Sequence, residues 1–157
     1  MEIRIVLGKG KAKMTPKEYL QQYRKLMTDI YLYEALKEEA VINVASLKSP
    51  AFGDKIQKSP ENDPIGNLVI EIEKKIAKYN IQILRCKTQM FVIETQIDQI
   101  KEIDKDFSTI LAYRYLVGLD WQQIADKMFM SLSKVTHLHG PALRKFEEMF
   151  ENDLKNA

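Results

Sequence analysis

The chain has 157 residues, enough for one domain or two small ones. Its hydrophobic content of 45% and charged content of 29% are those of an ordinary globular protein, and a net charge of +2 does not by itself indicate a nucleic-acid partner. A single cysteine, no apolar leader and no uncharged apolar run of the roughly 20 residues that a bilayer needs predict a cytoplasmic protein without disulfides, secretion or a membrane span.

Residues 1–13 carry four basic side chains against one acidic side chain. Two interpretations of this stretch stay open. Its "GKGKAK" would be encoded by purine-rich codons, as a ribosome-binding site would be, so that 1–13 is a translated leader ahead of a start at Met14. The alternative is a native basic arm, with "EIRIVL" as a short β-strand.

The first predicted helix begins after Thr15. "TPKE" supplies an N-cap threonine, a proline at the first helical position and Glu18 at the third, which is a capping box. Apolar residues then recur at steps of 3 or 4 from Tyr19 to Leu47, and this predicts one long amphipathic helix. The following stretch 48–64, "KSPAFGDKIQKSPENDP", holds three of the five prolines and is predicted to be a linker that ends in the helix cap Asp63-Pro64.

The second predicted helix has the most regular apolar pattern in the chain. Steps of 4 and 3 alternate through Ile65, Val69, Ile72, Ile76, Tyr79, Ile83, Cys86, Met90, Ile93, Ile97 and Ile100. Five such heptads predict a coiled-coil seam on a rod of about 50 Å, with Cys86 as a small core residue.

We expect residues 14–104 to form an all-α helical hairpin or coiled coil of these two helices. Because the second helix is longer than the first, part of its seam needs another partner. Two candidates stay open for that partner: a second copy of the chain, giving a homodimer, or the C-terminal domain.

Residues 105–157 are predicted to form a C-terminal helix-turn-helix domain. A helix in "DFSTILAYRYLVG" ends at Gly118, Asp120 and Gln123 form a second capping box, and Ser131 caps a helix that begins at Leu132. The positions that must pack in this motif are filled by suitable residues: a small side chain at the helix crossing, apolar ones under the turn and two on the inner face of the second helix, namely Ala125, Ile124, Met128, Met130, Val135 and Leu138.

One position departs from the motif. The turn commonly has a small residue, often glycine, four after the close-packed alanine, and here that residue is Phe129. A left-handed backbone conformation at a non-glycine residue costs about 1–2 kcal/mol. The alternative to the motif is an unspecialised helical bundle.

The predicted inner face of the second helix determines its outer face. With Val135 and Leu138 turned inward, four donors and acceptors suited to base edges and phosphates in a major groove face outward: Ser133, Lys134, Thr136 and His137. Lys127, Arg144 and Lys145 cluster around the same helix with Lys134. The overall charge of the segment is nevertheless small, so we expect weak intrinsic affinity that is raised by dimerisation or by a partner protein.

The two histidines of "KVTHLHGPALR" do not form a metal site. Residues two apart on a helix point about 200° away from each other, so His137 and His139 cannot bind one ion. His139 leans toward the core, where we expect a structural hydrogen bond. Gly140 is predicted to end this helix and Pro141 to begin the last one.

"ILAYRYLVGLDWQQIADKMFMSLSKVTHLHGPAL" resembles the fourth conserved region of bacterial σ⁷⁰-type factors, which reads promoter −35 elements. The chain is more similar still to small phage proteins of the RinA/ArpU type, regulators of late phage transcription. That resemblance rests on "RYL…W..IA..M..S...V..LHG.AL", extends to "MTPKEYL" and "DKIQKSP", and covers nearly all of 14–150. Phe129 and the 13-residue extension depart from the family pattern.

The resemblance implies a phage or prophage protein that binds promoter DNA, contacts host RNA polymerase in the bacterial cytoplasm and activates late packaging and morphogenesis genes. In that interpretation Ser133, Lys134, Thr136 and His137 read bases, while Lys127, Arg144 and Lys145 contact the DNA backbone.

Other classes of protein remain as alternatives of unequal weight. We expect no enzyme and no cofactor, because "GKGKAK" lacks the spacing and the following Ser/Thr of a phosphate-binding loop, and no nucleophile–base or paired-carboxylate pattern stands in a convincing context. A DNA-packaging component of the small-terminase type also joins a helix-turn-helix to oligomerising helices. A helical protein-interaction module without DNA binding is the third possibility.

Overall fold

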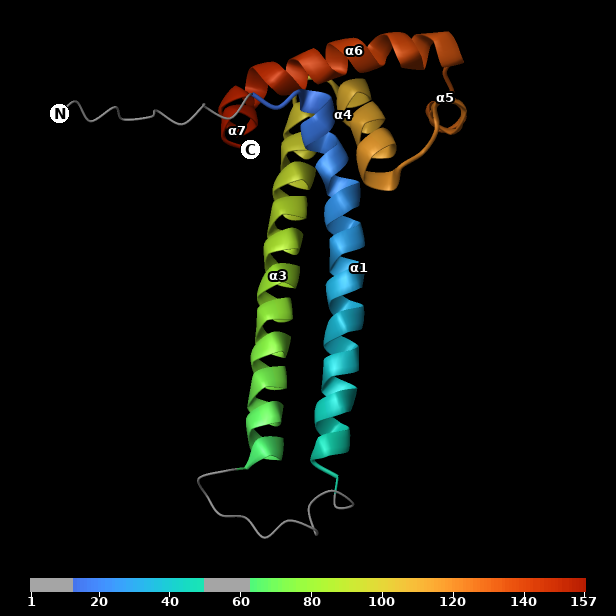
Figure 1. The fold of residues 1–157 in the computed structure, drawn as a ribbon. Helices are drawn as coiled ribbons and strands as arrows, with labels where there is room; N and C mark the ends of the chain where they lie inside the picture. Colours follow the sequence, from blue (N-terminus) through green and yellow to red (C-terminus); the bar gives the residue numbers. More distant parts are fainter. Residues whose placement is uncertain (1–12, 50–62) are drawn as a thin grey trace, which may run out of the picture. The chain divides into compact units, whose positions relative to one another are not determined.

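The computed structural model describes residues 13–49 and 63–157, and these are helical, with no strand among them (Figure 1). The all-α prediction is confirmed for this part of the chain. The helices are α1 (Pro16–Leu47), α3 (Pro64–Ile100), α4 (Lys105–Leu111), a π-helical segment (Ala112–Val117), α5 (Trp121–Met128), α6 (Leu132–Met149) and α7 (Glu151–Asn156). The described residues divide into two compact units, one of 25–49 and 63–91 and the other of 13–24 and 92–157.

The helix starts follow the caps written in the sequence. The Thr15 hydroxyl accepts a hydrogen bond from the Glu18 amide at 3.2 Å, and the Glu18 carboxylate accepts one from the Thr15 amide at 3.0 Å. Asp63 accepts from the Gly66 amide at 3.0 Å in front of α3. Each cap satisfies amide groups that have no partner inside the helix, so the predicted starts of α1 and α3 are confirmed.

In the unit of residues 25–49 and 63–91, α1 and α3 pack side by side. Ile30 of α1 and Ile83 and Cys86 of α3 are each 8% exposed and form its buried centre. Burial raises the pKa of the Cys86 thiol, which is the behaviour of a core residue. The inner seam of α3 thus faces α1 here, as its apolar spacing predicts.

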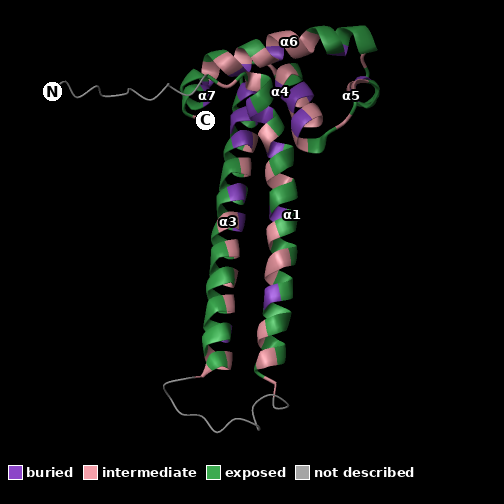
Figure 2. Ribbon diagram, viewed as in Figure 1, coloured by how far each residue is buried: buried purple, intermediate pink, exposed green. Residues whose placement is uncertain are grey.

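The other unit is built around the C-terminal part of α3. Ile93 and Ile100 are fully buried, as is Phe146 of α6, and the Ser108 hydroxyl donates a 2.8 Å hydrogen bond to the Ile97 carbonyl. Figure 2 shows buried residues, in purple, along this part of α3. The start of α1 joins this core, where the Tyr19 ring lies 5.9 Å from that of Phe146. Of the two partners considered for the end of the seam, the C-terminal segment is therefore the one that covers it.

Helix α6 corrects a prediction. It runs without a break from Leu132 to Met149 with Pro141 inside it, whereas Gly140 was predicted to end it. The physical reason is tertiary packing: Val135, Ala142 and Phe146 are all fully buried and lie on one helix face, at i, i+7 and i+11. Burying that continuous face outweighs the hydrogen bond that a helix loses at proline.

Some predictions fall outside the described residues. The leader or arm predicted for 1–13 is described only at Lys13, and the linker predicted for 48–64 only at its two ends. No helix among residues 13–49 and 63–157 is long and apolar enough to cross a membrane.

Candidate nucleic-acid interface

Helix α5 is held at its first turn by the predicted capping box. The Asp120 carboxylate accepts from the Gln123 amide at 2.8 Å, and the Gln123 side-chain oxygen accepts from the Asp120 amide at 3.0 Å. Ile124 and Ala125 are buried, while Gln122 and Lys127 lie on the exposed side. The cap therefore fixes the start of a short helix whose exposed side is polar.

The turn after α5 is a left-handed cap with an unusual occupant. Phe129 has φ 53° and ψ 41°, and it is the only non-glycine residue with positive φ among the described residues. The Met130 amide donates to the Ala125 carbonyl at 3.0 Å and the Phe129 amide to the Asp126 carbonyl at 3.3 Å. These two bonds are those of a Schellman motif, in which glycine is the usual left-handed residue.

The side chain at this turn is not packed. Phe129 is 95% exposed, so burial does not offset its backbone strain. The turn adopts the tight geometry at the expense of conformational energy at one residue.

Directly after the turn, Ser131 caps α6 by accepting from the Lys134 amide at 3.2 Å. The core beneath the turn joins α4, α5 and α6. Ile110, Ile124, Ala125 and Val135 are at most 1% exposed, and they are flanked by half-buried apolar side chains that include Trp121, Met128, Met130 and Leu138. The small Ala125 side chain lies among these larger ones, which suits a close approach of two helices. The residues predicted to pack around the turn therefore do so, and they fix how α6 is presented.

The opposite side of α6 is exposed and polar. We call it the outer face of α6: Ser133, Lys134, Thr136, His137 and Arg144. Ser133, His137 and Arg144 follow one another at i, i+4 and i+11, so they lie along one stripe, with Lys134 and Thr136 on its two flanks. Arg144 belongs to this stripe because α6 continues through Gly140 and Pro141.

Hydrogen bonds within α6 define what two of these side chains offer. The Thr136 hydroxyl donates to the carbonyls of Leu132 and Ser133, both at 3.0 Å, which leaves its methyl group and an oxygen lone pair outward. His137 Nδ1 lies 2.7 Å from the Ser133 carbonyl, so this nitrogen carries a proton and donates. The ring is thereby oriented, and its Nε2 is left to interact outside the helix.

The predicted backbone-contacting residues are not equally placed. Lys127 on α5 and Arg144 on α6 are exposed, but the Lys145 ammonium makes a 3.0 Å ion pair with Glu148. Lys145 is eleven residues from Lys134, about 16 Å along the helix axis. The positive charge is therefore spread along α6 and not gathered at one end.

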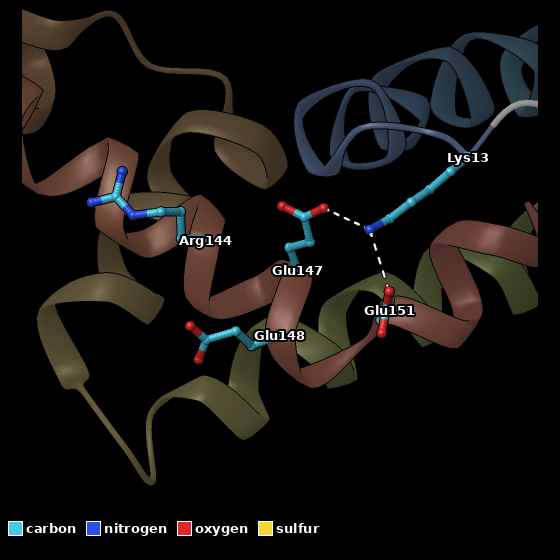
Figure 3. A pocket seen from close by; sticks show the side chains of 5 residues that line it. All are labelled: Lys13, Arg144, Glu147, Glu148 and Glu151. Carbon is cyan, nitrogen blue, oxygen red and sulfur yellow. Dashed lines mark hydrogen bonds and ion pairs between the residues drawn. The ribbon is translucent and has the colours of Figure 1, made fainter.

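Acidic side chains limit the positive region at the far end of α6. Arg144 lines a surface pocket with Lys13, Glu147, Glu148 and Glu151 (Figure 3). The Lys13 ammonium lies 2.7 Å from the Glu147 carboxylate and 3.6 Å from that of Glu151. These carboxylates repel phosphate, so the part of α6 suited to an anionic partner ends at Arg144.

His139 is part of an aromatic stack that sequence reasoning did not foresee in full. Its Nε2 and the Tyr115 hydroxyl are hydrogen-bonded at 2.9 Å. Its ring makes an edge contact with Trp121, with the ring centroids 4.7 Å apart. The Arg114 guanidinium lies over the Trp121 ring, 4.6 Å from its centroid. The same guanidinium donates a 2.9 Å hydrogen bond to the Leu119 carbonyl. The structural role predicted for His139 is confirmed.

The stack has an electrostatic consequence. Burial, with a smaller contribution from the nearby charge of Arg114, lowers the pKa of His139, and burial raises that of Tyr115. Both shifts favour the neutral forms, so the imidazole and the phenol are neutral near pH 7. No local pattern joins Arg114 to Trp121 or His139, because the three residues come from different elements.

No protein-family model matches the chain, and no match was found to a curated protein or to a solved structure. Among the described residues, no group of His, Cys, Asp and Glu side chains is arranged to hold a metal ion.

Proposed function

We propose that the protein is a sequence-specific double-stranded DNA-binding regulator of transcription, and that α5, the turn at 129–131 and α6 act as its helix-turn-helix. The outer face of α6 is the observation that carries the proposal. It presents a hydroxyl, an ammonium, a methyl group, an oriented imidazole and a guanidinium on the side opposite the buried Val135 and Phe146. This is the chemistry that reads base edges and phosphates in a major groove.

The turn geometry supports the same proposal. A capped α5, a Schellman turn and a capped α6 over a common core hold α6 in one orientation. Rigid presentation matters because base readout depends on the placement of a few side chains. The helices α1 and α3 would form the helical hairpin of the proposed architecture, with the helix-turn-helix domain C-terminal to it.

The small charge of the interface bears on its affinity. Each phosphate contact by lysine or arginine releases counterions, and α6 offers few such contacts beside Glu147 and Glu148. A single copy is therefore expected to bind weakly. We propose a homodimer that engages two half-sites, and, from the resemblance to late phage regulators, contact with host RNA polymerase at promoters of packaging and morphogenesis genes in the bacterial cytoplasm.

A binding selection against sheared DNA of the phage or prophage genome tests the proposal. Wild-type protein is expected to enrich one intergenic segment ahead of packaging or structural genes at about 150 mM salt, and Lys134→Ala/His137→Ala to lose that enrichment. Lys101→Ala, which removes an exposed lysine outside α5 and α6, is the matched control and retains it.

The other outcomes point to the other two classes of protein. Enrichment beside terminase genes together with a ring of eight or more subunits would identify a packaging component. Native-like enrichment by Lys134→Ala/His137→Ala, or no enrichment by any variant, would contradict DNA reading through α6 and leave a protein-interaction module.

A further inference from the structure

Helix α3 carries a second apolar row on the side away from its inner seam. Ile70, Ala77, Leu84 and Phe91 follow one another at seven residues, and Ile81 lies three before Leu84. All are exposed: Ile70 50%, Ile81 52%, Leu84 66% and Phe91 67%. We call these five residues the outer strip.

The spacing of the outer strip fits a helical partner. At 100° per residue the strip is centred about 120° around α3 from Ile83, which faces α1. A strict seven-residue repeat drifts about 20° per heptad on a straight helix, and a left-handed supercoil with another helix removes that drift. Since α1 already covers the inner seam, the strip is presented to a different helix.

The charges along the strip indicate what that helix is. One edge carries Glu73 and, fourteen residues later, Lys87; the other carries Glu71 and, again fourteen residues later, Arg85. Of these four charges, the acidic ones lie toward the N-terminal end of α3 and the basic ones toward its C-terminal end. A copy of the same helix running in the opposite direction places every one of these four charges against its opposite. Lys78, which lies between Glu71 and Arg85 on the second edge, would face its own copy near the dyad, where both exposed side chains can extend into water.

We propose that the outer strip is a homodimer interface, occupied by the outer strip of a second copy in antiparallel orientation. The register pairs residues whose numbers sum to about 158, with Ala77 opposite Ile81 and Ile70 opposite Thr88. The inference rests on the homodimer of the proposed function and identifies the surface that forms it.

Existing ion pairs do not compete strongly with this arrangement. Glu73 lies 2.7 Å from Lys48, Lys87 lies 3.5 Å from Glu34, and Glu71 lies 2.7 Å from Lys74. Exposed pairs of this kind are weak. In the dimer the charges of the second copy extend these pairs into networks.

The parallel orientation is disfavoured by Lys74. It occupies a core heptad position of the strip, four residues after Ile70 and three before Ala77. In a parallel dimer two Lys74 side chains would meet in one layer, which is a charge repulsion. In the antiparallel dimer Lys74 lies opposite Leu84, and its stem can cover apolar surface while the ammonium reaches water.

The size of the strip sets the strength of the dimer. From Ile70 to Phe91 it is about 32 Å long and, with a helix about 10 Å wide, covers roughly 320 Å² on each copy. A standard stable interface buries about 800 Å² per partner. The dimer is therefore expected to have a dissociation constant in the micromolar range. Binding of two copies to adjacent DNA half-sites is expected to shift the equilibrium further toward the dimer.

Sedimentation velocity of the full chain across micromolar concentrations tests the surface. Wild type is expected to show a concentration-dependent dimer, which Leu84→Glu weakens at least tenfold. Leu32→Glu, the same substitution at a 53% exposed leucine of α1, leaves it unchanged. A wild-type monomer up to about 0.1 mM, or equal loss in both variants, overturns the proposal.

Cysteine cross-linking in a Cys86→Ala background tests the orientation. The antiparallel register places Ile70 opposite Thr88, within the roughly 7 Å between Cα atoms that a disulfide spans, and separates two Thr88 positions by about 27 Å. Ile70→Cys/Thr88→Cys is expected to cross-link and Thr88→Cys alone not to. A cross-link through Thr88→Cys alone, or none with either protein, contradicts the antiparallel strip.

Failure of this inference is distinct from failure of the proposed function. A monomer that still binds its DNA segment through Lys134 and His137 refutes the outer strip and leaves DNA reading intact. A dimer that is weakened by Leu84→Glu but binds no DNA supports the outer strip and refutes DNA reading.

Discussion

Replacing Phe129 with glycine is expected to stabilise the protein, although it deletes a large apolar side chain. The backbone strain at φ 53° is about 1–2 kcal/mol for a residue with a Cβ atom, and glycine has none. Since Phe129 is 95% exposed, almost no packing is lost. Glycine also raises the conformational entropy of the unfolded chain, which lowers the unfolding free energy by about 0.4–1 kcal/mol and offsets part of the gain.

The net gain in unfolding free energy for Phe129→Gly is about 0.5–1 kcal/mol. For a chain of this length 1 kcal/mol corresponds to roughly 2–4 °C, so the midpoint of thermal unfolding is expected to rise by about 1–4 °C. Circular dichroism at the helix band, followed during heating and in urea, measures both quantities.

Phe129→Ala is the matched control for this prediction. Alanine removes the same aromatic ring but keeps the Cβ atom, so the strain remains and stability is expected to stay within about 0.5 kcal/mol of wild type. If the glycine variant is no more stable than the alanine variant, the left-handed turn is not strained and the account of the Schellman turn is wrong.

Three further substitutions test the supports of the interface. Asp120→Ala removes the carboxylate that accepts from the Gln123 amide at the α5 cap, and it is expected to cost about 1 kcal/mol of unfolding free energy in urea melts. Asp126→Ala, on the exposed side of the same helix, is expected to cost less than half of that. Ala125→Met adds volume at a side chain that is only 1% exposed, and it is expected to lower the unfolding free energy by about 1–3 kcal/mol in the same assay. Ala35→Met, the same substitution at an exposed position, is expected to leave it nearly unchanged. Equal effects of the two substitutions would mean that α5 and α6 do not pack closely at Ala125. The lowered pKa of His139 means that the folded state favours the neutral ring. Its contribution to the unfolding free energy is therefore fully present above the ordinary pKa of 6.5 and is lost as the pH falls from there toward the folded-state pKa. Urea melts between pH 7.5 and 5.5 should show this loss in wild type and not in His139→Gln.

Local signals in the sequence predicted what local chemistry decides. Thr15, Asp63, Asp120 and Ser131 each cap the helix that their sequence context indicates, because a cap needs only a side-chain oxygen and an amide two or three residues away. The apolar spacing of α3 likewise predicted its inner seam.

Tertiary packing decided what the sequence did not reveal. Gly140 and Pro141 are local helix-ending signals, yet burial of Ala142 and Phe146 on the face of Val135 keeps α6 continuous. As a result Arg144 lies on the same stripe as the predicted base-reading residues. The stacking of Arg114 on Trp121 depends on how separate elements come together, which residue spacing along one element does not encode.

The equilibrium affinity for a selected DNA segment and for a scrambled one, measured by fluorescence anisotropy over a range of salt concentrations, tests the central claim most directly. Wild type is expected to prefer the selected segment by at least about a thousandfold. Lys134→Ala is expected to lower the slope of log affinity against log salt by about 1, and His137→Ala to reduce the preference about 5- to 150-fold, while Lys101→Ala changes neither. Equal affinity for both segments, or a preference that survives both substitutions on the outer face of α6, would contradict sequence-specific reading of DNA by this helix.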